Sequence, residues 1–588
     1  MSVVLIDGKT TFNTVSQILN SKIIYDLICE MIELSERKRT SLLNLFNLFI
    51  NDIGSAKTDE RYDVKGIIML LETLVVSPIE SIDSSPYLSF PKLSDKKNLL
   101  VTFVERLYNL WRSKHRFMIR EEEFTEDLSK RVFKQLLFQN NNEQLKLLVR
   151  NTYRQILINI SNFRMKILRQ THSGAQAGFM TDKVIPLKKA IPNNGESIYD
   201  VNIVWSTVFD PPAIFYTRSN KRRGIFKVVN KPILNKVKIK NENNWFLFPI
   251  MVGPKMIFVI VHKEYLALGA GLANLFEFVD LAVVKTRKPD GVYFLGIDKA
   301  FFEEDDDYNG IIYREEDGTY VGLVGDDPSV DYFGYMKKMI LTIHNLLIID
   351  ENRLPIHGSL ARIRLKNGKE SNVMLVGDSG AGKSETLDAF ERLKEEVSEV
   401  DILIDDMGSL AINDTGEVVA YGTETGAFVR LDDLEPGYAY SAMDRSIFMN
   451  PNEINARVIV PYSNYKDIIL PTKVDYFLYA NNYEKSDSSS IDFFTNSEDA
   501  LRIFSEGARM AKGTTAEKGL TYSYFANPFG AIQMKDKHTI IAEKFMNAML
   551  KGKTKIGMIK TQLGINGYEK EGPLMAAKSL LNMIDKDN

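Results

Sequence analysis

The sequence is poor in cysteine, in net charge and in long apolar runs. Cys29 is the only cysteine among 588 residues, so neither an internal disulfide nor a multi-cysteine zinc site can form. The formal net charge of −3 argues against a general nucleic-acid binder, whose surface would carry a basic excess. The longest uncharged apolar stretches, such as residues 245–254 and 265–276, are too short to cross a bilayer, and the N-terminus lacks the features of a signal peptide. These absences predict a cytoplasmic protein that binds neither nucleic acid nor a membrane.

The length of the chain predicts two to four domains. Apolar residues recur at three- and four-residue spacing over residues 11–170, which predicts a helical N-terminal extension, assigned here to residues 1–195. We interpret it as an accessory or oligomerisation region that contacts a protein partner or another subunit. Short β-rich runs follow and predict a β-rich domain over residues 196–350. Strands, turns and final helices alternate over residues 351–588, so the predicted fold class is mixed α/β.

One segment carries chemistry that can be read directly. A short apolar strand leads into the motif G-x-x-x-x-G-K-S, and a helical pattern follows it, which is the context of a phosphate-binding P-loop. Glycines let backbone N–H groups curl around a polyphosphate, and the helix N-terminus adds partial positive charge. Lys383 would reach the outer phosphates and the Ser384 hydroxyl would bind Mg²⁺. The predicted nucleotide-binding residues are Gly377, Asp378, Ser379, Gly380, Ala381, Gly382, Lys383, Ser384 and Glu385.

Other polar residues stand near the P-loop in sequence. Asp405 and Asp406 end an apolar strand about twenty residues after the P-loop, where a metal-binding acid is needed for triphosphate chemistry. His357 precedes the strand pair that leads into the P-loop, and a lone histidine at such a position is more often structural. Lys337 and Lys338 begin a helical run, where the simplest interpretation is a solvated helix end.

Taken in order, these pieces resemble the ATP-dependent branch of the phosphoenolpyruvate carboxykinase family over roughly residues 200–565. The family's Gly-x-Met-Lys-Lys segment corresponds to residues 334–338, and its Asn-x-Arg-Val-x-x-Pro segment to residues 455–461. Its Glu-Gly-Gly-Cys-Tyr-Ala-Lys segment is similar to residues 424–430, and its Gly-Arg-Ser-Pro-Lys substrate segment to residues 217–221, each with substitutions. The segments over residues 513–519 and 525–530 are similar to the family's nucleotide-base segment and the Phe-Gly stretch after it.

The resemblance implies ATP-dependent conversion of oxaloacetate to phosphoenolpyruvate and CO₂. It implies Mn²⁺ held by Lys338, His357 and Asp406, and Mg²⁺ held by Ser384 together with the Asp405–Asp406 pair. Lys383 and Arg457 would neutralise the moving phosphoryl group, and Arg218 would clamp a substrate carboxylate. Lys518 stands in the base segment where the ATP branch usually has Arg, so this segment does not decide between ATP and GTP. The Cys-containing P-loop of the GTP branch is missing, which favours ATP over GTP.

A second family competes for the P-loop itself. The run Asp378 to Glu385 and the His357-Gly358 pair are closer to HPr kinase/phosphorylase, which phosphorylates a hydroxyl. In that interpretation Asp405 or Asp406 would be the base that accepts the hydroxyl proton. The lysine pair, the Asn-x-Arg-Val segment and the long C-terminal portion favour the carboxykinase family. A third alternative is a nucleotide-binding regulatory module that engages a partner through its helical region.

Overall fold

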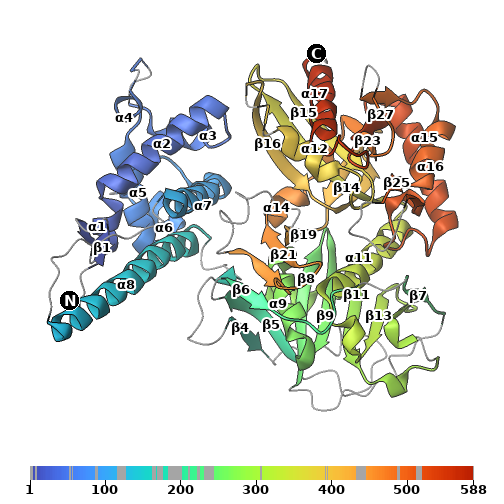
Figure 1. The fold of residues 1–588 in the computed structure, drawn as a ribbon, viewed down its shortest axis with the longest axis horizontal. Coiled ribbons are helices and arrows are strands. Elements are labelled where there is room, and N and C mark those ends of the chain that lie inside the picture. The colour runs from blue at the N-terminus through green and yellow to red at the C-terminus, as the bar shows by residue number, and fades with distance from the viewer. Residues whose placement is uncertain are drawn as a thin grey trace. The chain divides into compact units, whose positions relative to one another are not determined.

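The computed structural model consists of two compact units (Figure 1), one formed by residues 1–168 and the other by most of the chain after residue 168. The first is called the N-terminal unit and the second the C-terminal unit below. The predicted end of the helical extension at residue 195 lies outside the described residues, and the predicted division at residue 350 stays a prediction. The described residues are 4–6, 10–12, 14–51, 54–55, 57–86, 90–114, 127–161, 167–168, 176–182, 201–209, 212–221, 225–230, 244–304, 307–390, 392–393, 395–431, 445–486, 490–511 and 519–586.

The N-terminal unit is helical. Its apolar residues at helical spacing, such as Leu27, Ile28 and Met31, are buried in one common core. The stretch from Ser77 to Pro91 reads as a loop in sequence, but it contains a short helix because Ile79 and Ile82 are buried in that core. The elements are β1 (Val4–Ile6), β2 (Thr10–Phe12), α1 (Val15–Leu19), α2 (Lys22–Lys38), α3 (Leu43–Phe46), α4 (Thr58–Arg61), α5 (Val64–Val76), α6 (Ile79–Asp83), α7 (Lys97–Lys114), α8 (Leu128–Ile160) and β3 (Ile167–Leu168).

The C-terminal unit is mixed α/β and contains two large sheets. The first runs in the order β5-β8-β9-β11-β13-β12-β7, with β4 beside β5 and β10 beside β8. Its strands β8, β9 and β11 are almost entirely buried and are apolar except for Lys255 and His262 at the two ends of β9, as expected for strands covered on both faces. The bounds are β4 (Ala177–Asp182), β5 (Asn202–Phe209), β7 (Lys227–Val228), β8 (Trp245–Val252), β9 (Lys255–His262), β10 (Glu277–Phe278), β11 (Gly291–Ile297), β12 (Ile311–Arg314) and β13 (Tyr320–Gly325).

The second sheet carries the P-loop strand and runs in the order β22-β18-β17-β14-β15-β23-β27-β24, with β16 also paired to β14. Successive residues of a strand face opposite sides, so Val373 and Leu375 belong to one apolar core and Met374 and Val376 to another. The bounds are β14 (Leu354–Leu365), β15 (Glu370–Val376), β16 (Val397–Ile404), β17 (Met407–Ile412), β18 (Val418–Gly422), β22 (Thr472–Lys473), β23 (Tyr476–Asn481), β24 (Ile491–Phe493) and β27 (Lys555–Lys560).

Helices cover both faces of this second sheet. α12 (Lys383–Phe390) and α17 (Glu571–Lys586) share the core of Val373, while α15 (Ser497–Glu506) and α16 (Lys535–Lys551) share the core of Met374. α11 (Phe333–Asp350) packs against β11 and β13 of the first sheet and against β14 and β17 of the second, so it joins the two. None of the helices within the described ranges has the length and apolarity that a membrane span requires.

Smaller elements complete the unit. A third sheet has the order β19-β21-β20-β6, and a two-stranded hairpin is formed by β25 and β26. The bounds are β6 (Ala213–Phe215), β19 (Gly426–Arg430), β20 (Ile447–Met449), β21 (Arg457–Pro461), β25 (Ala508–Met510), β26 (Leu520–Tyr522), α9 (Leu266–Leu275), α10 (Leu281–Thr286) and α14 (Tyr465–Ile468). The short β-rich runs predicted after the helical region are found as strands, and the predicted mixed α/β fold class is confirmed.

Candidate functional site

The predicted P-loop connects the end of β15 to the beginning of α12, as its sequence requires. Gly380 and Gly382 have φ angles of 81° and 92°, which only glycine adopts without strain. A Cβ on Gly382 would also lie 2.5 Å from Thr561 Oγ1, so a side chain does not fit there. Ser384 is exposed on the first turn of α12 and Glu385 is half-buried beside it.

Two neighbouring strands help to fix this loop. β15 is parallel to β23, and β23 is parallel to β27, so the carboxyl ends of all three meet at one edge of the sheet. Asn482, after β23, donates to the Gly380 carbonyl at 2.9 Å, and Thr561, after β27, donates to the Ala381 carbonyl at 2.7 Å. Both side chains are buried, so these two hydrogen bonds hold the loop backbone from the interior of the unit.

Lys383 is buried and lies across the loop that precedes it. Its Nζ donates to the Gly377 carbonyl at 2.6 Å and to the Asp378 carbonyl at 3.2 Å. The positive charge of Lys383 also acts on Asp405 and Asp406, which follow β16. The structure thus brings the P-loop lysine and the predicted acidic pair together.

His357 lies on β14 between the P-loop and the acidic pair and is 3% exposed. Its Nδ1 contacts the carbonyl oxygen of Ala526, and its Nε2 lies 2.8 Å from Asp406 Oδ1. A carbonyl oxygen can only accept, so Nδ1 must carry the proton in that contact. Nε2 then faces a carboxylate oxygen, an arrangement that calls for a second proton or for a cation shared by the two atoms.

The lysine pair on α11 is buried, not solvated as its sequence position suggests. Lys337 Nζ donates to Asp406 Oδ2 at 2.7 Å and lies 2.8 Å from Glu424 Oε1. Lys338, which the resemblance implies as a metal ligand, instead has its Nζ 5.5 Å from the centre of the Phe226 ring. Two carboxylates hold Lys337 as a cation, since burial lowers its pKa but Asp406 and Glu424 raise it by more.

Three carboxyl groups, the buried Glu424 and the half-buried Asp405 and Asp406, are perturbed in different directions. Burial and the neighbouring charge of Asp406 raise the pKa of Asp405 to about 6, against the influence of Lys337 and Lys383. Burial also opposes ionisation of Asp406, but Lys337 and His357 outweigh it and hold the pKa of Asp406 well below its usual range. Burial raises the pKa of Glu424 to about 7, although Lys337 opposes the rise. The site therefore holds one firmly ionised carboxylate and two that titrate nearer neutrality.

Asp406 and its partners His357, Lys337 and Glu424 are called the Asp406 cluster below, and Arg457 is linked to this cluster by the Phe428 ring. The Phe428 ring lies 5.4 Å from the Arg457 guanidinium carbon and 6.0 Å from Lys337 Nζ, so the two cations share one ring. Arg457 Nε also donates to Asn455 Oδ1 at 3.1 Å, and Asn455 Nδ2 donates to the Asn220 carbonyl at 2.7 Å. Asn455 therefore ties Arg457 to the segment that contains Arg218.

Arg218 itself is engaged by a buried acid. Its Nε donates to Asp331 Oδ2 at 2.8 Å, its backbone N–H donates to the same oxygen at 3.0 Å, and its guanidinium lies 5.0 Å from the Tyr265 ring centre. Burial lowers the pKa of Arg218, but the Asp331 carboxylate raises it by more. No direct contact between Arg218 and the Asp406 cluster is found among the described residues.

Asp378 in the P-loop lies near the Nδ1 side of His357, opposite the Nε2 atom that faces Asp406. Arg509 on β25 donates from Nε to Asp378 Oδ2 at 2.9 Å, and His357 Nδ1 lies 3.9 Å from Asp378 Oδ1. Burial raises the pKa of Asp378, yet His357 and Arg509 together bring it below its ordinary value. Lys518, the predicted base-contacting residue, lies outside the described residues.

The donor atoms fit a divalent cation in part. His357 Nε2, the Asp406 carboxylate and the exposed Ser384 hydroxyl are of the kinds that Mn²⁺ and Mg²⁺ bind. A protonated lysine cannot be a ligand, so Lys337 does not fit in its observed contacts. Across the described ranges, no group of three or more His, Cys, Asp or Glu side chains is arranged to hold a metal ion.

Several functional candidates were missed from the sequence. Glu424 belongs to a segment already noted for its resemblance, and Lys337 to the noted lysine pair, but sequence alone does not say that they pair. Asn482 and Thr561 each follow an apolar strand, a signal that could have located them. Arg509 and the Ala526 carbonyl carry no such signal, because their roles depend on distant segments that meet only in the folded unit.

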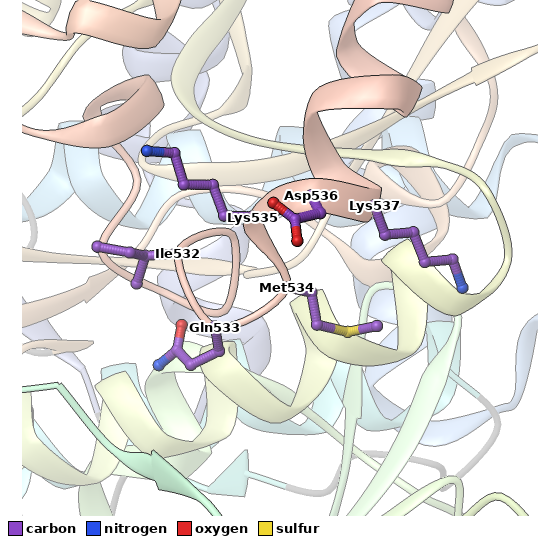
Figure 2. A pocket seen from close by; sticks show the side chains of 6 residues that line it. All are labelled: Ile532, Gln533, Met534, Lys535, Asp536 and Lys537. Atoms are coloured by element: carbon purple, nitrogen blue, oxygen red, sulfur yellow. The ribbon is translucent and has the colours of Figure 1, made fainter.

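A separate hollow lies at the start of α16 (Figure 2) and contains none of the residues above. Asp350 on α11 holds Lys537 at 2.9 Å, and Lys535 lies 5.2 Å from the Tyr524 ring centre, so contacts within the unit engage both lysines. The hollow is lined by Ile532, Gln533, Met534, Lys535, Asp536 and Lys537.

Comparison with known proteins adds no family to this description. The chain matches no protein-family model, and it matches no curated protein. The function of the site therefore has to be inferred from the residues and geometry described above.

Proposed function

We propose that this chain transfers the γ-phosphoryl group of a nucleoside triphosphate, ATP in preference to GTP, to the enolate formed when oxaloacetate loses CO₂. One observation carries the proposal. The P-loop lysine Lys383, the acidic pair Asp405–Asp406, His357 and a buried lysine of the 334–338 segment converge in one place. These are segments that the carboxykinase family uses together, and they come from widely separated parts of this sequence.

We infer on the same grounds that the C-terminal unit has a carboxykinase-like P-loop fold. Residues 351–588 would then form the nucleotide-binding domain and residues 196–350 the substrate domain. The parallel strands β15, β23 and β27, which meet at the P-loop, and the helix α11 between the two large sheets support this inference.

The reaction would break the bond between the departing carboxylate and the adjacent carbon of oxaloacetate. The electron pair of that bond forms the enolate, whose oxygen attacks the γ-phosphorus while the bond to ADP breaks. Lys383 and Arg457 would neutralise charge on the moving phosphoryl group, and Arg218 would anchor a substrate carboxylate. Mn²⁺ and Mg²⁺, held by His357, Asp406 and Ser384, would supply charge to stabilise the enolate and the triphosphate.

The link made by Asn455 favours an enolate acceptor. It joins Arg457 to the 217–221 segment through two hydrogen bonds, so the proposed carboxylate clamp and phosphoryl-neutralising arginine share one support. A hydroxyl kinase needs no clamp for a second carboxylate. Fixing Arg218 relative to Arg457 would serve an acid substrate directly.

A second candidate is a kinase that phosphorylates a hydroxyl of a protein or a small molecule. The pKa of Asp405, raised by burial and by Asp406 to about 6, favours it. A base with a pKa near the working pH accepts a hydroxyl proton most effectively. Asp405 would take that proton while Lys383 neutralises the phosphoryl group.

The deciding experiment incubates the purified chain with oxaloacetate, ATP and Mn²⁺ and measures phosphoenolpyruvate and ADP. We expect both products from the parent, loss of both in Lys383→Ala, and loss of phosphoenolpyruvate in Arg218→Ala. Lys544→Ala, at an exposed position on α16, is the control and should retain activity. ADP formation that depends on an added hydroxyl compound and survives Arg218→Ala would establish the second candidate. No ATP turnover with either acceptor would refute both.

A further inference from the structure

The backbone next to His357 is strained at two adjacent residues. Phe525 and Ala526 have φ angles of 52° and 50°. These angles lie in the left-handed backbone region that residues other than glycine, asparagine and aspartate rarely adopt. Neither residue is one of these three types. Such conformations persist where surrounding structure imposes them, and they concentrate at functional sites.

The turn is held by a dense set of contacts. Ala526 N–H donates to the Ser523 carbonyl at 2.6 Å, and Asn527 N–H donates to the Tyr524 carbonyl at 3.0 Å. The Phe525 ring is buried and meets the His538 ring edge-on with centres 4.8 Å apart. These contacts leave the Ala526 carbonyl directed at His357 Nδ1.

A glycine elsewhere in the chain makes room for the turn. Gly507 ends α15, and a Cβ there would lie 1.7 Å from the Ser523 carbonyl oxygen and 2.7 Å from the Ala526 nitrogen. Ser523 N–H also donates to the Gly507 carbonyl at 3.2 Å. Two residues beyond Gly507, Arg509 binds Asp378 of the P-loop. The turn is therefore built into the same framework that supports the P-loop.

The ring of His357 is also fixed from a second direction. Phe529 lies edge-on to it, with ring centres 5.8 Å apart and an interplanar angle of 89°. The Phe529 carbonyl accepts from Asn345 Nδ2 at 2.6 Å, which anchors this part of the loop to α11. Loop 523–530 thus contacts the imidazole through a carbonyl at Nδ1 and an aromatic ring at its side.

We propose that the strained Phe525–Ala526 turn positions His357, with Ala526 as the positioning residue whose carbonyl keeps the proton on Nδ1 and turns Nε2 toward Asp406. This deepens the proposed function and rests on it, because a fixed Nε2 is useful only if His357 serves the phosphoryl-transfer site. Outer contacts of this kind set the orientation of a ligating histidine, and their loss typically lowers metal affinity about 10- to 100-fold.

The proton on Nδ1 can be tested without any activity measurement. The chain has six histidines, so ¹⁵N-histidine NMR of the parent and of His357→Gln assigns the His357 signals by difference. We expect a protonated Nδ1 whose proton exchanges slowly with water. An Nδ1 without a proton would overturn the proposal, since a carbonyl oxygen cannot then be its partner.

Ala526→Gly tests the strain itself. Glycine keeps the carbonyl but releases the backbone, so we expect faster exchange of the Nδ1 proton and a fall in Mn²⁺ affinity of about tenfold or more, measured by electron paramagnetic resonance without nucleotide. The thermal midpoint should change little, because relieved strain offsets the lost methyl contact. Unchanged exchange, with or without a lower midpoint, would mean that the turn is ordinary packing.

Arg39→Gly is the matched control. Arg39 ends α2 in the N-terminal unit with a φ angle of 50°, so glycine relieves comparable strain there. It should leave the His357 signals and Mn²⁺ affinity unchanged. If the parent binds no Mn²⁺ and makes no product, the proposed function fails, whereas the NMR result still decides whether the turn fixes the ring.

Discussion

Replacing Glu424 by Gln should change how the stability of the C-terminal unit depends on pH. Glu424 is 2% exposed, and its Oε1 lies 2.8 Å from Lys337 Nζ. Burial raises its pKa from an ordinary 4.5 to about 7, with Lys337 opposing the rise and Asp406 adding to it. Glutamine keeps the shape and an oxygen for Lys337 but does not titrate.

The sign follows from proton binding. Between pH 4.5 and 7 the folded protein keeps a proton on Glu424 that the unfolded chain has released, so the free energy of unfolding falls as pH rises through this window. Below pH 4.5 the contribution of Glu424 is fully present. Within this window each pH unit lowers the free energy of unfolding by about 1.4 kcal/mol, so the parent loses about 3 kcal/mol of stability by pH 8. Glu424→Gln lacks this loss, so its stability should gain about 3 kcal/mol on the parent between pH 4.5 and pH 8.

Urea unfolding at several pH values measures the effect. Trp111 lies in the N-terminal unit, whereas Trp205 and Trp245 lie on β5 and β8, so a Trp111→Phe background makes fluorescence report the C-terminal unit. Glu264→Gln, at an exposed position, is the control and should follow the parent at every pH. Parallel curves for Glu424→Gln and the parent would refute the reasoning, because the carboxyl would then titrate alike in both states.

Three further substitutions test other contacts. Lys383→Ala should lower ATP turnover at least about 100-fold, because the only lysine of the P-loop is lost; normal steady-state turnover would exclude both enzymatic candidates. Gly382→Ala places a Cβ 2.5 Å from Thr561 Oγ1 at a φ of 92°, so it should lower both the thermal midpoint and ATP affinity, and a fully stable, ATP-binding variant would contradict the observed loop. Lys337→Met should lower the free energy of unfolding by about 3–5 kcal/mol at pH 8, because it leaves Asp406 and Glu424 without their shared cation. A loss below about 1 kcal/mol in urea unfolding would show that the ion pairs of Lys337 do not form.

Local sequence determined much of the architecture. Helical spacing predicted the N-terminal helices, and the short β-rich runs predicted the strand-rich region that contains β8 and β9, because a buried element must present apolar residues at its own period. The strand, the glycines and the helix of the P-loop were likewise readable, since Gly380 and Gly382 answer a local demand for a positive φ angle. The short helix α6 was not, because its formation depends on packing of Ile79 and Ile82 against other helices.

The tertiary structure decided which side chains meet. The sequence presents Lys337 and Lys338 as equivalent neighbours, but successive residues of a helix point in directions about 100° apart. Only the packing of α11 between the two large sheets turns Lys337 toward Asp406 and Glu424 and leaves Lys338 beside Phe226. The Ala526 carbonyl reaches His357 across 169 residues for the same reason. Residue types and local periods are encoded in the chain itself, whereas charge pairing and hydrogen-bond partners depend on distances that exist only after the sheets and helices have packed.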